Sequence, residues 1–201
     1  MPKENPPDSA PASKAVLAAG KHVVCEKPLA LTPTESAELL HLAEESGLVH
    51  CTNYNLRFYP LCQEARTRVR RGDLGRIWNA HGTYIQDWLT LPIDAEGQKQ
   101  AEWRTDPARA GQSAVLADIG VHAFQLAEFI TGLRVERLLA DLAAVVPGRQ
   151  LDDDCTVLLR FGNGARGVLL ASQIELGEQN GLRIRVHGDR GGLSWRQETP
   201  N

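Results

Sequence analysis

The chain has 201 residues, with 22 Lys and Arg against 25 Asp and Glu and a formal net charge of −3. This balance gives no reason to expect a nucleic acid or an anionic membrane as a partner. No apolar run reaches the roughly 18 residues of a membrane span, and the polar first residues lack the apolar core of a secretion signal. The four cysteines, Cys25, Cys51, Cys62 and Cys155, have no paired spacing. We therefore expect no disulfide, no metal site and a reducing, cytoplasmic setting.

The first quarter of the chain alternates helix and strand signals. We predict a helix over 8–19, with Asp8 or Ser9 as its cap and Gly20 as its end. The short apolar run 22–25 is typical of a strand that is buried on both faces.

A capping box marks the next helix. Thr32 and Glu35 have the required spacing, Pro33 occupies the first helical position, and Gly47 ends the pattern. A second strand is predicted over 48–52. Strand, helix and strand in this order predict a parallel sheet with helices packed on it.

A further helix is predicted from Pro60 to Gly72. We interpret its arginines as a solvated face, not as a nucleic-acid patch, because acidic residues lie nearby and no aromatic residues interleave. These arginines are Arg66, Arg68, Arg70 and Arg71.

From residue 76 onward the pattern changes to strands joined by tight turns. Gly162-Asn163-Gly164 carries the Asn-Gly hairpin signal, and a second turn is predicted over 188–192. Consecutive hairpins predict an antiparallel sheet, with a helix that begins near Asp118 packed on one face. The predicted strands cover residues 76–86, 135–146, 156–161, 165–173 and 182–187.

Residues 162–167 match the dinucleotide-binding pattern G-x-G-x-x-G. That motif binds pyrophosphate only where a strand precedes it and a helix follows. Here the following residues, 168–173, have a strand pattern, so we interpret the motif as a hairpin. No other stretch of the chain matches the pattern.

Asp118 and His122 stand four residues apart, directly ahead of an apolar helical pattern. If the helix starts near Asp118, both side chains lie on one face, because residues i and i+4 stack on successive turns. Lys27 follows the first predicted strand. A lysine, an aspartate and a histidine in one cleft can move a proton to or from a hydroxyl group.

Three motifs occur in the order seen in one superfamily. They are residues 19–28, which end in Cys25-Glu26-Lys27-Pro28, residues 53–60 (Asn-Tyr-Asn-Leu-Arg-Phe-Tyr-Pro) and residues 118–122 (Asp-Ile-Gly-Val-His). On these motifs the chain resembles the glucose–fructose oxidoreductase/inositol dehydrogenase/MocA-like family of NAD(P)-dependent sugar and polyol dehydrogenases. The resemblance implies part of a Rossmann domain followed by an open, mainly antiparallel sheet domain, with the active site between them.

The resemblance divides the chain into a partial Rossmann domain over 1–55 and a sheet domain over 56–201 that forms homo-oligomers through its sheet face. The family's first strands and its glycine-rich loop have no counterpart in this sequence, and the chain stops before the family's usual end. We therefore expect an internal fragment of a longer dehydrogenase that binds its cofactor poorly. The residue that selects NAD or NADP has no counterpart either, so both stay open.

The resemblance also implies roles for the three motifs. Lys27 contacts the substrate hydroxyl near the nicotinamide, and Glu26 and Pro28 lie at the cofactor. A cis peptide at Pro28 would fix the direction of the lysine. His122 is the candidate general base, and Asp118 orients it or binds a neighbouring hydroxyl.

Further residues are expected around a sugar or polyol substrate, because aromatic and charged groups suit sugar faces and hydroxyls. Arg57 is equally compatible with an inter-domain salt bridge. Tyr84, Asp87 and the neighbouring Trp88 are equally compatible with a packed strand end, and Trp103 and Arg104 with ordinary packing. The expected substrate residues are Asn53, Arg57, Tyr84, Asp87, Trp103 and Arg104.

Two other functions stay open. Some members of the superfamily use NAD transiently while they cleave a glycosidic bond, which leaves nicotinamide absorbance unchanged, whereas a dehydrogenase changes it stoichiometrically. The other alternative is that the chain is not an enzyme but an inert fragment or an association module. An association module is possible because an incomplete parallel sheet leaves an unpaired edge, which another chain can cover.

Overall fold

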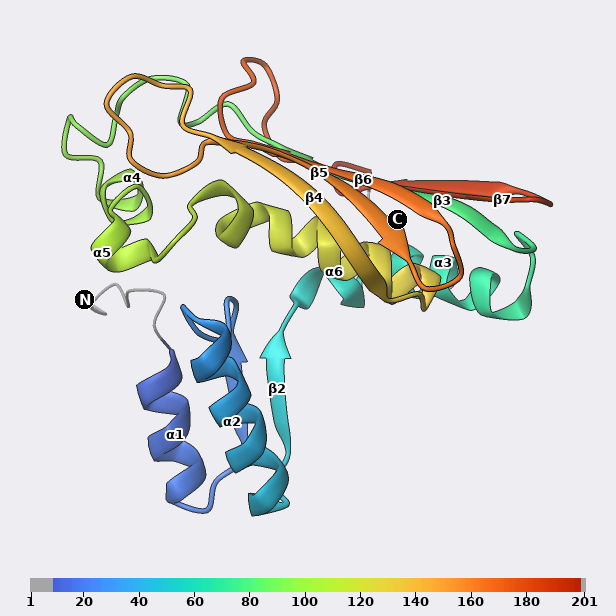
Figure 1. Cartoon of the computed structure of the whole chain (residues 1–201), viewed down its shortest axis with the longest axis horizontal. Coiled ribbons are helices and arrows are strands. Elements are labelled where there is room, and N and C mark those ends of the chain that lie inside the picture. The colour runs from blue at the N-terminus through green and yellow to red at the C-terminus, as the bar shows by residue number, and fades with distance from the viewer. Residues whose placement is uncertain (1–8, 200–201) are drawn as a thin grey trace.

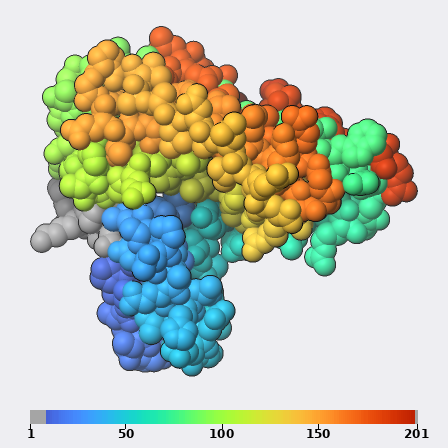
Figure 2. All heavy atoms as spheres, viewed as in Figure 1, coloured from blue at the N-terminus to red at the C-terminus, as the bar shows by residue number. Residues whose placement is uncertain are grey.

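A computed structural model describes residues 9–199, which form two lobes (Figure 1). Figure 2 shows the N-terminal lobe, in blue, projecting from one side of the larger sheet lobe. No helix within the described residues is long and apolar enough to cross a bilayer. The N-terminal lobe consists of α1 (Ala10–Ala18), β1 (Val23–Glu26), α2 (Pro33–Ser46) and β2 (His50–Asn53).

The two strands of the N-terminal lobe pair in parallel, and α1 and α2 lie side by side against them (Figure 1). This arrangement confirms the predicted strand–helix–strand unit. The prediction that the first strand is buried on both faces is wrong, because the helices cover only one face. Cys25 points into the lobe and is buried, whereas Val24 is 73% exposed.

Local capping sets the ends of the helices in this lobe. The Thr32 hydroxyl accepts a hydrogen bond from the Glu35 N–H at 3.2 Å, and the Glu35 carboxylate accepts one from the Thr32 N–H at 3.0 Å. Gly47 adopts the left-handed conformation that ends α2. These features confirm the predicted capping box. Ser9 occupies the N-cap position of α1, as predicted, although its side chain makes no capping bond; Asp8 lies outside the described residues.

The sheet lobe is built on six strands in the order β4-β5-β6-β3-β7-β8. All neighbours are antiparallel except β3 and β6, which run parallel. The sheet is therefore mixed, because the β5–β6 hairpin inserts beside β3 after a long excursion of the chain. The strands are β3 (Ile77–Ile85), β4 (Val135–Ala143), β5 (Asp154–Phe161), β6 (Arg166–Ser172), β7 (Gly181–Gly188) and β8 (Gly192–Arg196). The sequence did not predict β8.

Helices cover one face of this sheet and leave the other open (Figure 1). The buried core lies between the sheet and α6, and includes Leu126, Leu159, Leu169 and Ile184. Because side chains alternate along a strand, the intervening strand residues point to the open face. The remaining elements are η1 (Asn55–Phe58), α3 (Pro60–Arg71), α4 (Lys99–Arg104), α5 (Pro107–Ala110), the π-helical turn η2 (Leu116–Gly120) and α6 (Val121–Thr131). Of these, the sequence predicted α3 and α6.

The G-x-G-x-x-G stretch at 162–167 forms the hairpin between β5 and β6, as predicted. Its last glycine, Gly167, is required by packing. A Cβ atom at this position would lie 2.4 Å from the Ala80 carbonyl oxygen and 2.9 Å from the Phe161 ring. A backbone oxygen cannot move away without disturbing the β3–β6 ladder, so the position excludes a side chain.

Gly167→Ala is therefore expected to lower the free energy of unfolding by about 1–3 kcal/mol, the usual cost of overpacking. Urea denaturation followed by tryptophan fluorescence measures this change. Gly191→Ala is the control, because its nearest heavy atom would lie at an ordinary 3.8 Å. Equal unfolding free energies for the two variants would contradict the packing argument.

Candidate active site

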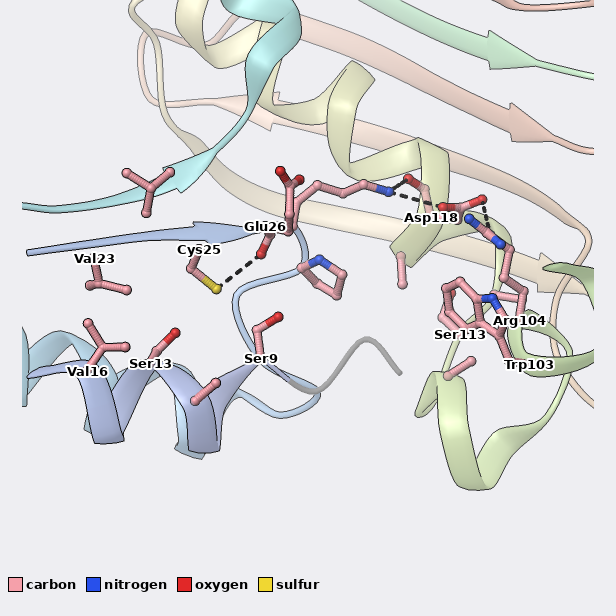
Figure 3. A pocket seen from close by; sticks show the side chains of 17 residues that line it. Ser9, Ser13, Val16, Val23, Cys25, Glu26, Trp103, Arg104, Ser113 and Asp118 are labelled. Carbon is pink, nitrogen blue, oxygen red and sulfur yellow. Dashed lines mark hydrogen bonds and ion pairs between the residues drawn. The ribbon is translucent and has the colours of Figure 1, made fainter. Parts of the chain in front are cut away.

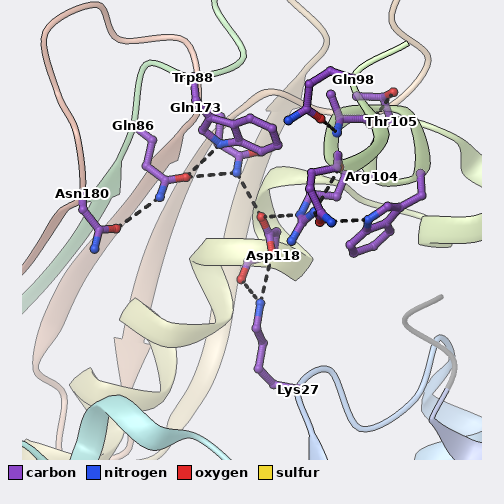
Figure 4. Close-up of polar contacts among 12 residues, drawn as sticks. Lys27, Gln86, Trp88, Gln98, Arg104, Thr105, Asp118, Gln173 and Asn180 are labelled. Carbon is purple, nitrogen blue, oxygen red and sulfur yellow. Dashed lines mark hydrogen bonds and ion pairs between the residues drawn. The ribbon is translucent and has the colours of Figure 1, made fainter. Parts of the chain in front are cut away.

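Lys27 and Asp118 meet where the two lobes touch (Figure 4). Lys27 follows β1, and its peptide bond to Pro28 is cis, as predicted. The Lys27 ammonium donates a hydrogen bond to the Asp118 carbonyl oxygen and lies 3.1 Å from Asp118 Oδ1. Both side chains are 18% exposed. The contact therefore joins residues 91 positions apart in the sequence, and both charged groups are largely shielded from water.

The Asp118 carboxylate is surrounded by donors. Its Oδ2 accepts hydrogen bonds from Arg104 Nε and from Gln173 Nε2, each at 3.1 Å. Burial raises the pKa of this carboxyl, but the positive charges of Lys27 and Arg104 outweigh that effect and hold the pKa below its ordinary value. Asp118 is therefore an anion at neutral pH and serves to hold cations, with no capacity left to act as an acid.

His122 is held by packing, without hydrogen bonds to any described residue. Its ring lies edge-on to Tyr54, with centroids 6.0 Å apart, and 6.2 Å from the Tyr84 ring. Its Nδ1 atom is buried and has no partner in the described part of the chain. The Asp118 carboxylate makes no hydrogen bond to this ring within the described residues, because Lys27, Arg104 and Gln173 occupy it. That Asp118 orients His122 or binds a neighbouring hydroxyl stays a prediction.

Asp118 and His122 belong to different helical elements and have different neighbours. The prediction that both lie on one face assumed an α-helix from Asp118 onward, in which residues i and i+4 stack. Asp118 instead lies inside η2, whose i→i+5 pattern is wider than that of an α-helix. Lys27 and Arg104 contact Asp118, while His122, in the first turn of α6, faces the two tyrosines.

The environment also fixes the charge of His122. Burial, and then the nearby positive charge of Lys27, lower its pKa to about 4, and Asp118 offsets only part of this. The imidazole is therefore neutral at pH 7. A neutral imidazole is able to accept a proton, which is the property that a general base needs.

A cavity of about 490 Å³ opens beside Lys27, between the N-terminal lobe and the segment from α4 to η2 (Figure 3). Small side chains line both walls and leave the space open. Those with alanine or serine side chains are Ser9, Ala12, Ser13, Ala110, Ser113, Ala114 and Ala117. The polar end is formed by Lys27, Asp118 and Arg104.

The structure brings most of the predicted site residues together. Tyr84 lies against His122, outside the cavity. The Arg104 guanidinium lies over the Trp103 ring at 4.1 Å and near the Trp88 ring at 5.8 Å, a cation–π arrangement that fixes its direction. The predicted site residues that line the cavity are Glu26, Lys27, Pro28, Trp103, Arg104 and Asp118.

Besides Tyr84, three predicted substrate residues do not line this cavity and have other partners. Asn53 donates to the Glu26 carboxylate at 2.7 Å. The Arg57 guanidinium contacts the Cys51 sulfur at 3.5 Å and makes no ion pair within residues 9–199, so the alternative of an inter-domain salt bridge is not found there. Its role at a substrate stays a prediction. Asp87 accepts a hydrogen bond from the Gly177 N–H at 3.3 Å and holds a loop.

A row of amides behind Asp118 was not predicted from the sequence. Gln173 Nε2 also donates to Gln86 Oε1 at 3.2 Å, and Gln86 Nε2 donates to Asn180 Oδ1 at 3.2 Å (Figure 4). The Tyr84 hydroxyl donates to the same Asn180 oxygen at 2.7 Å, and burial raises the pKa of Tyr84 to about 12, which keeps it a donor. A polar residue directly after an apolar strand, as at Gln173, was the available signal.

Comparison with known proteins identifies the family. Residues 62–194 match the GFO/IDH/MocA C-terminal domain, and residues 8–54 match the oxidoreductase family with an NAD-binding Rossmann fold. The chain belongs to this oxidoreductase family. The resemblance drawn from the three motifs is therefore confirmed, together with the fold class that it implied.

Solved structures agree with this assignment. An inositol dehydrogenase homolog from Azotobacter vinelandii, complexed with NAD+, is 33% identical and superposes with a TM-score of 0.93 over 98% of this chain and 51% of that one. A second structure of an inositol dehydrogenase homolog from Azotobacter vinelandii, complexed with NADH and myo-inositol, is 32% identical. It superposes with a TM-score of 0.88 over 98% of this chain and 50% of that one. Levoglucosan dehydrogenase from Pseudarthrobacter phenanthrenivorans is 30% identical over 92% of this chain and 51% of its own length. The chain spans about half the length of such relatives.

The residues around the cavity fit the nicotinamide end of a dinucleotide. Small side chains on both walls leave room for a flat ring, and Lys27 lies at the polar end. The G-x-G-x-x-G stretch of the chain joins two strands and so offers no helix N-terminus to a pyrophosphate. Within residues 9–199, no cluster of three or more His, Cys, Asp or Glu side chains is arranged to hold a metal ion.

The lowered pKa of His122 predicts a pH effect on stability. Between pH 6.5 and about 4 the unfolded chain binds a proton at His122 that the folded chain does not, so the free energy of unfolding falls as the pH drops through this window. Below about pH 4 both states are protonated and the loss stops. His122→Gln removes this titrating group, so the fall in the free energy of unfolding across this window should be smaller than in the unmodified chain, by at most about 3 kcal/mol.

Urea denaturation at a series of pH values measures the effect, and NMR titration of the His122 ring should give a midpoint near 4. His50→Gln, at an exposed position on β2, is the matched control and should leave the curve unchanged. A His122→Gln curve parallel to that of the unmodified chain would contradict the prediction.

Proposed function

We propose that this chain carries the substrate side of an NAD(P)-dependent dehydrogenase that oxidises a sugar, inositol or related polyol. The observation that supports the proposal most strongly is the Lys27–Asp118 contact across the lobes, beside a cavity and a neutral histidine. A bound nicotinamide would supply the hydride acceptor in this cavity.

Lys27 is suited to bind the reacting hydroxyl. Its ammonium has three N–H donors, and Asp118 accepts two of them, through its carbonyl oxygen and through Oδ1. The third donor is left for the oxygen of a substrate hydroxyl. Because Asp118 holds the ammonium by two atoms, the direction of this third donor is restricted, which positions the hydroxyl.

His122 is suited to take the hydroxyl proton. It is neutral at pH 7, because burial and the charge of Lys27 disfavour the imidazolium. The hydroxyl would give its proton to His122 as the carbon that bears it gave up a hydride, so the carbonyl product would form without a free alkoxide. Asp118 stays ionised throughout and balances the charges of Lys27 and Arg104.

The substrate class follows from the walls around these groups and from the relatives. Arg104, with Trp103 and Trp88, offers indole faces and guanidinium donors, which suit the apolar faces and hydroxyls of a sugar ring. The names of the relatives refer to inositol and levoglucosan. NAD and NADP are both compatible with the residues near Lys27.

The proposal is tested in two stages on the chain itself. Reduced nicotinamide mononucleotide, which lacks the adenosine half, should bind with an enhancement of its fluorescence. Ala117→Leu, which fills the cavity, should abolish that signal, whereas Ala108→Leu, at an exposed position of α5, should preserve it. Intact dinucleotide should bind little better, and a micromolar dissociation constant for it would overturn this expectation of weak binding.

Turnover is then measured as nicotinamide absorbance with myo-inositol and levoglucosan. Lys27→Met and His122→Asn should each lower the rate by about 10²-fold or more, and Lys21→Met, an exposed lysine of the same lobe, should have no effect. A wild-type chain that neither binds the mononucleotide nor turns over any polyol would sink the proposal. Sugar cleavage without a change in absorbance would instead favour the hydrolase alternative.

We also propose that the chain forms homo-oligomers through the open face of the sheet. Leu139 of β4, Leu158 of β5 and Val168 of β6 are neighbours across the strands on this face. Leu139 and Leu158 are 69% and 42% exposed. A continuous apolar surface of this kind is typical of a protein interface.

Leu158→Glu is expected to convert the oligomer to monomer, because it places a charge in the centre of that surface. Sedimentation velocity over a range of concentrations measures the change. Leu176→Glu is the control, since Leu176 is exposed in the loop between β6 and β7, away from the strands. A wild-type chain that is monomeric at all concentrations, or a Leu158→Glu variant that still associates, would contradict the proposal.

A further inference from the structure

Asp152 is a buried acid that the proposed chemistry does not use. It is 7% exposed and lies just before β5. Its carboxylate accepts three hydrogen bonds, from the Ser113 hydroxyl at 2.9 Å, the Ala114 N–H at 2.9 Å and the Leu116 N–H at 3.1 Å. Ser113 and Ala114 lead into η2, and Leu116 is its first residue. The carboxylate therefore fixes the entry to the turn that carries Asp118.

The π-helical turn is held by side chains that lie outside it. Asp118, at its centre, contacts Lys27, and His122, beyond its end, faces Tyr54. Asp152 holds the start of the turn, and Gln173 holds its centre through Asp118 Oδ2.

The neighbouring acid provides a natural comparison. Asp153 is 1% exposed and also accepts two backbone N–H bonds, from Val145 at 2.7 Å and Val146 at 3.0 Å. It forms an ion pair with Arg149 at 3.0 Å as well. None of these partners belongs to η2. The two adjacent acids therefore have similar burial and similar bonding, but only Asp152 holds the turn that carries Asp118.

We propose that Asp152 is a positioning residue, which acts through η2 and Asp118 to hold the Lys27 ammonium at the site. Its importance for catalysis rests on the proposed function, but the positioning itself does not. A purely structural acid would stabilise the sheet lobe and leave the reactivity of Lys27, in the other lobe, unchanged. The proposal therefore requires an effect on a lysine more than a hundred positions away in the sequence.

The experiment measures the reactivity of Lys27. The chain is acetylated with a limiting amount of a small amine-reactive ester, and mass spectrometry gives the ratio of Lys27 to Lys21 modification. Lys21 is exposed in the same lobe and serves as the internal reference. In Asp152→Asn, with one acceptor oxygen replaced by an amide group, the ratio should rise about fivefold, the change expected from the loss of one net hydrogen bond.

Asp153→Asn is the matched control and should leave the ratio near that of the unmodified chain. An unchanged ratio in Asp152→Asn, or an equal rise in both variants, would overturn the proposal. If Asp152→Asn does not fold, Ser113→Ala decides, because it removes one of the three donors and should still raise the ratio; no rise would count against the proposal. The readout needs neither cofactor nor turnover, so a failure of the proposed function is seen separately, in the mononucleotide titration.

Discussion

The ion pair between Lys27 and Asp118 is the interaction on which the site depends. It joins the end of β1 to the π-helical turn of the sheet lobe, and both side chains are largely removed from water. A partly buried carboxylate is costly unless it is paired, and Asp118 has Lys27, Arg104 and Gln173 as partners. The same contact that neutralises this charge therefore also fixes the relative position of the chemical groups contributed by the two lobes.

The environment separates the charge states of the two groups in the Asp-x-x-x-His motif. Asp118 lies next to two cations and stays ionised. His122 lies among aromatic rings and near Lys27, so it stays neutral. Both groups are unprotonated at pH 7 for opposite reasons, one because of its neighbours and the other because of its burial. This difference assigns them different tasks, since the anion holds the lysine and the neutral imidazole is free to accept a proton.

The mixed topology of the large sheet supplies the polar wall behind Asp118. The strands β3 and β6 are parallel neighbours, so their carboxyl ends lie at the same edge of the sheet. Gln86 follows the first of them and Gln173 follows the second, and their side chains meet there. An antiparallel arrangement of these two strands would place the two amides at opposite edges. The position of Gln173 against Asp118 is thus a consequence of strand order.

The sequence by itself determined the features that depend on a few neighbouring residues. Short motifs predict the capping box at Thr32, the hairpin at 162–167 and the candidate set of Lys27, Asp118 and His122. Only the tertiary structure decided the π turn that carries Asp118, the parallel pairing of β3 with β6, and the contacts of Asp152 and Gln173. These features depend on contacts between residues that are far apart in the chain, whose hydrogen bonds form only when the core is packed, so no local pattern encodes them.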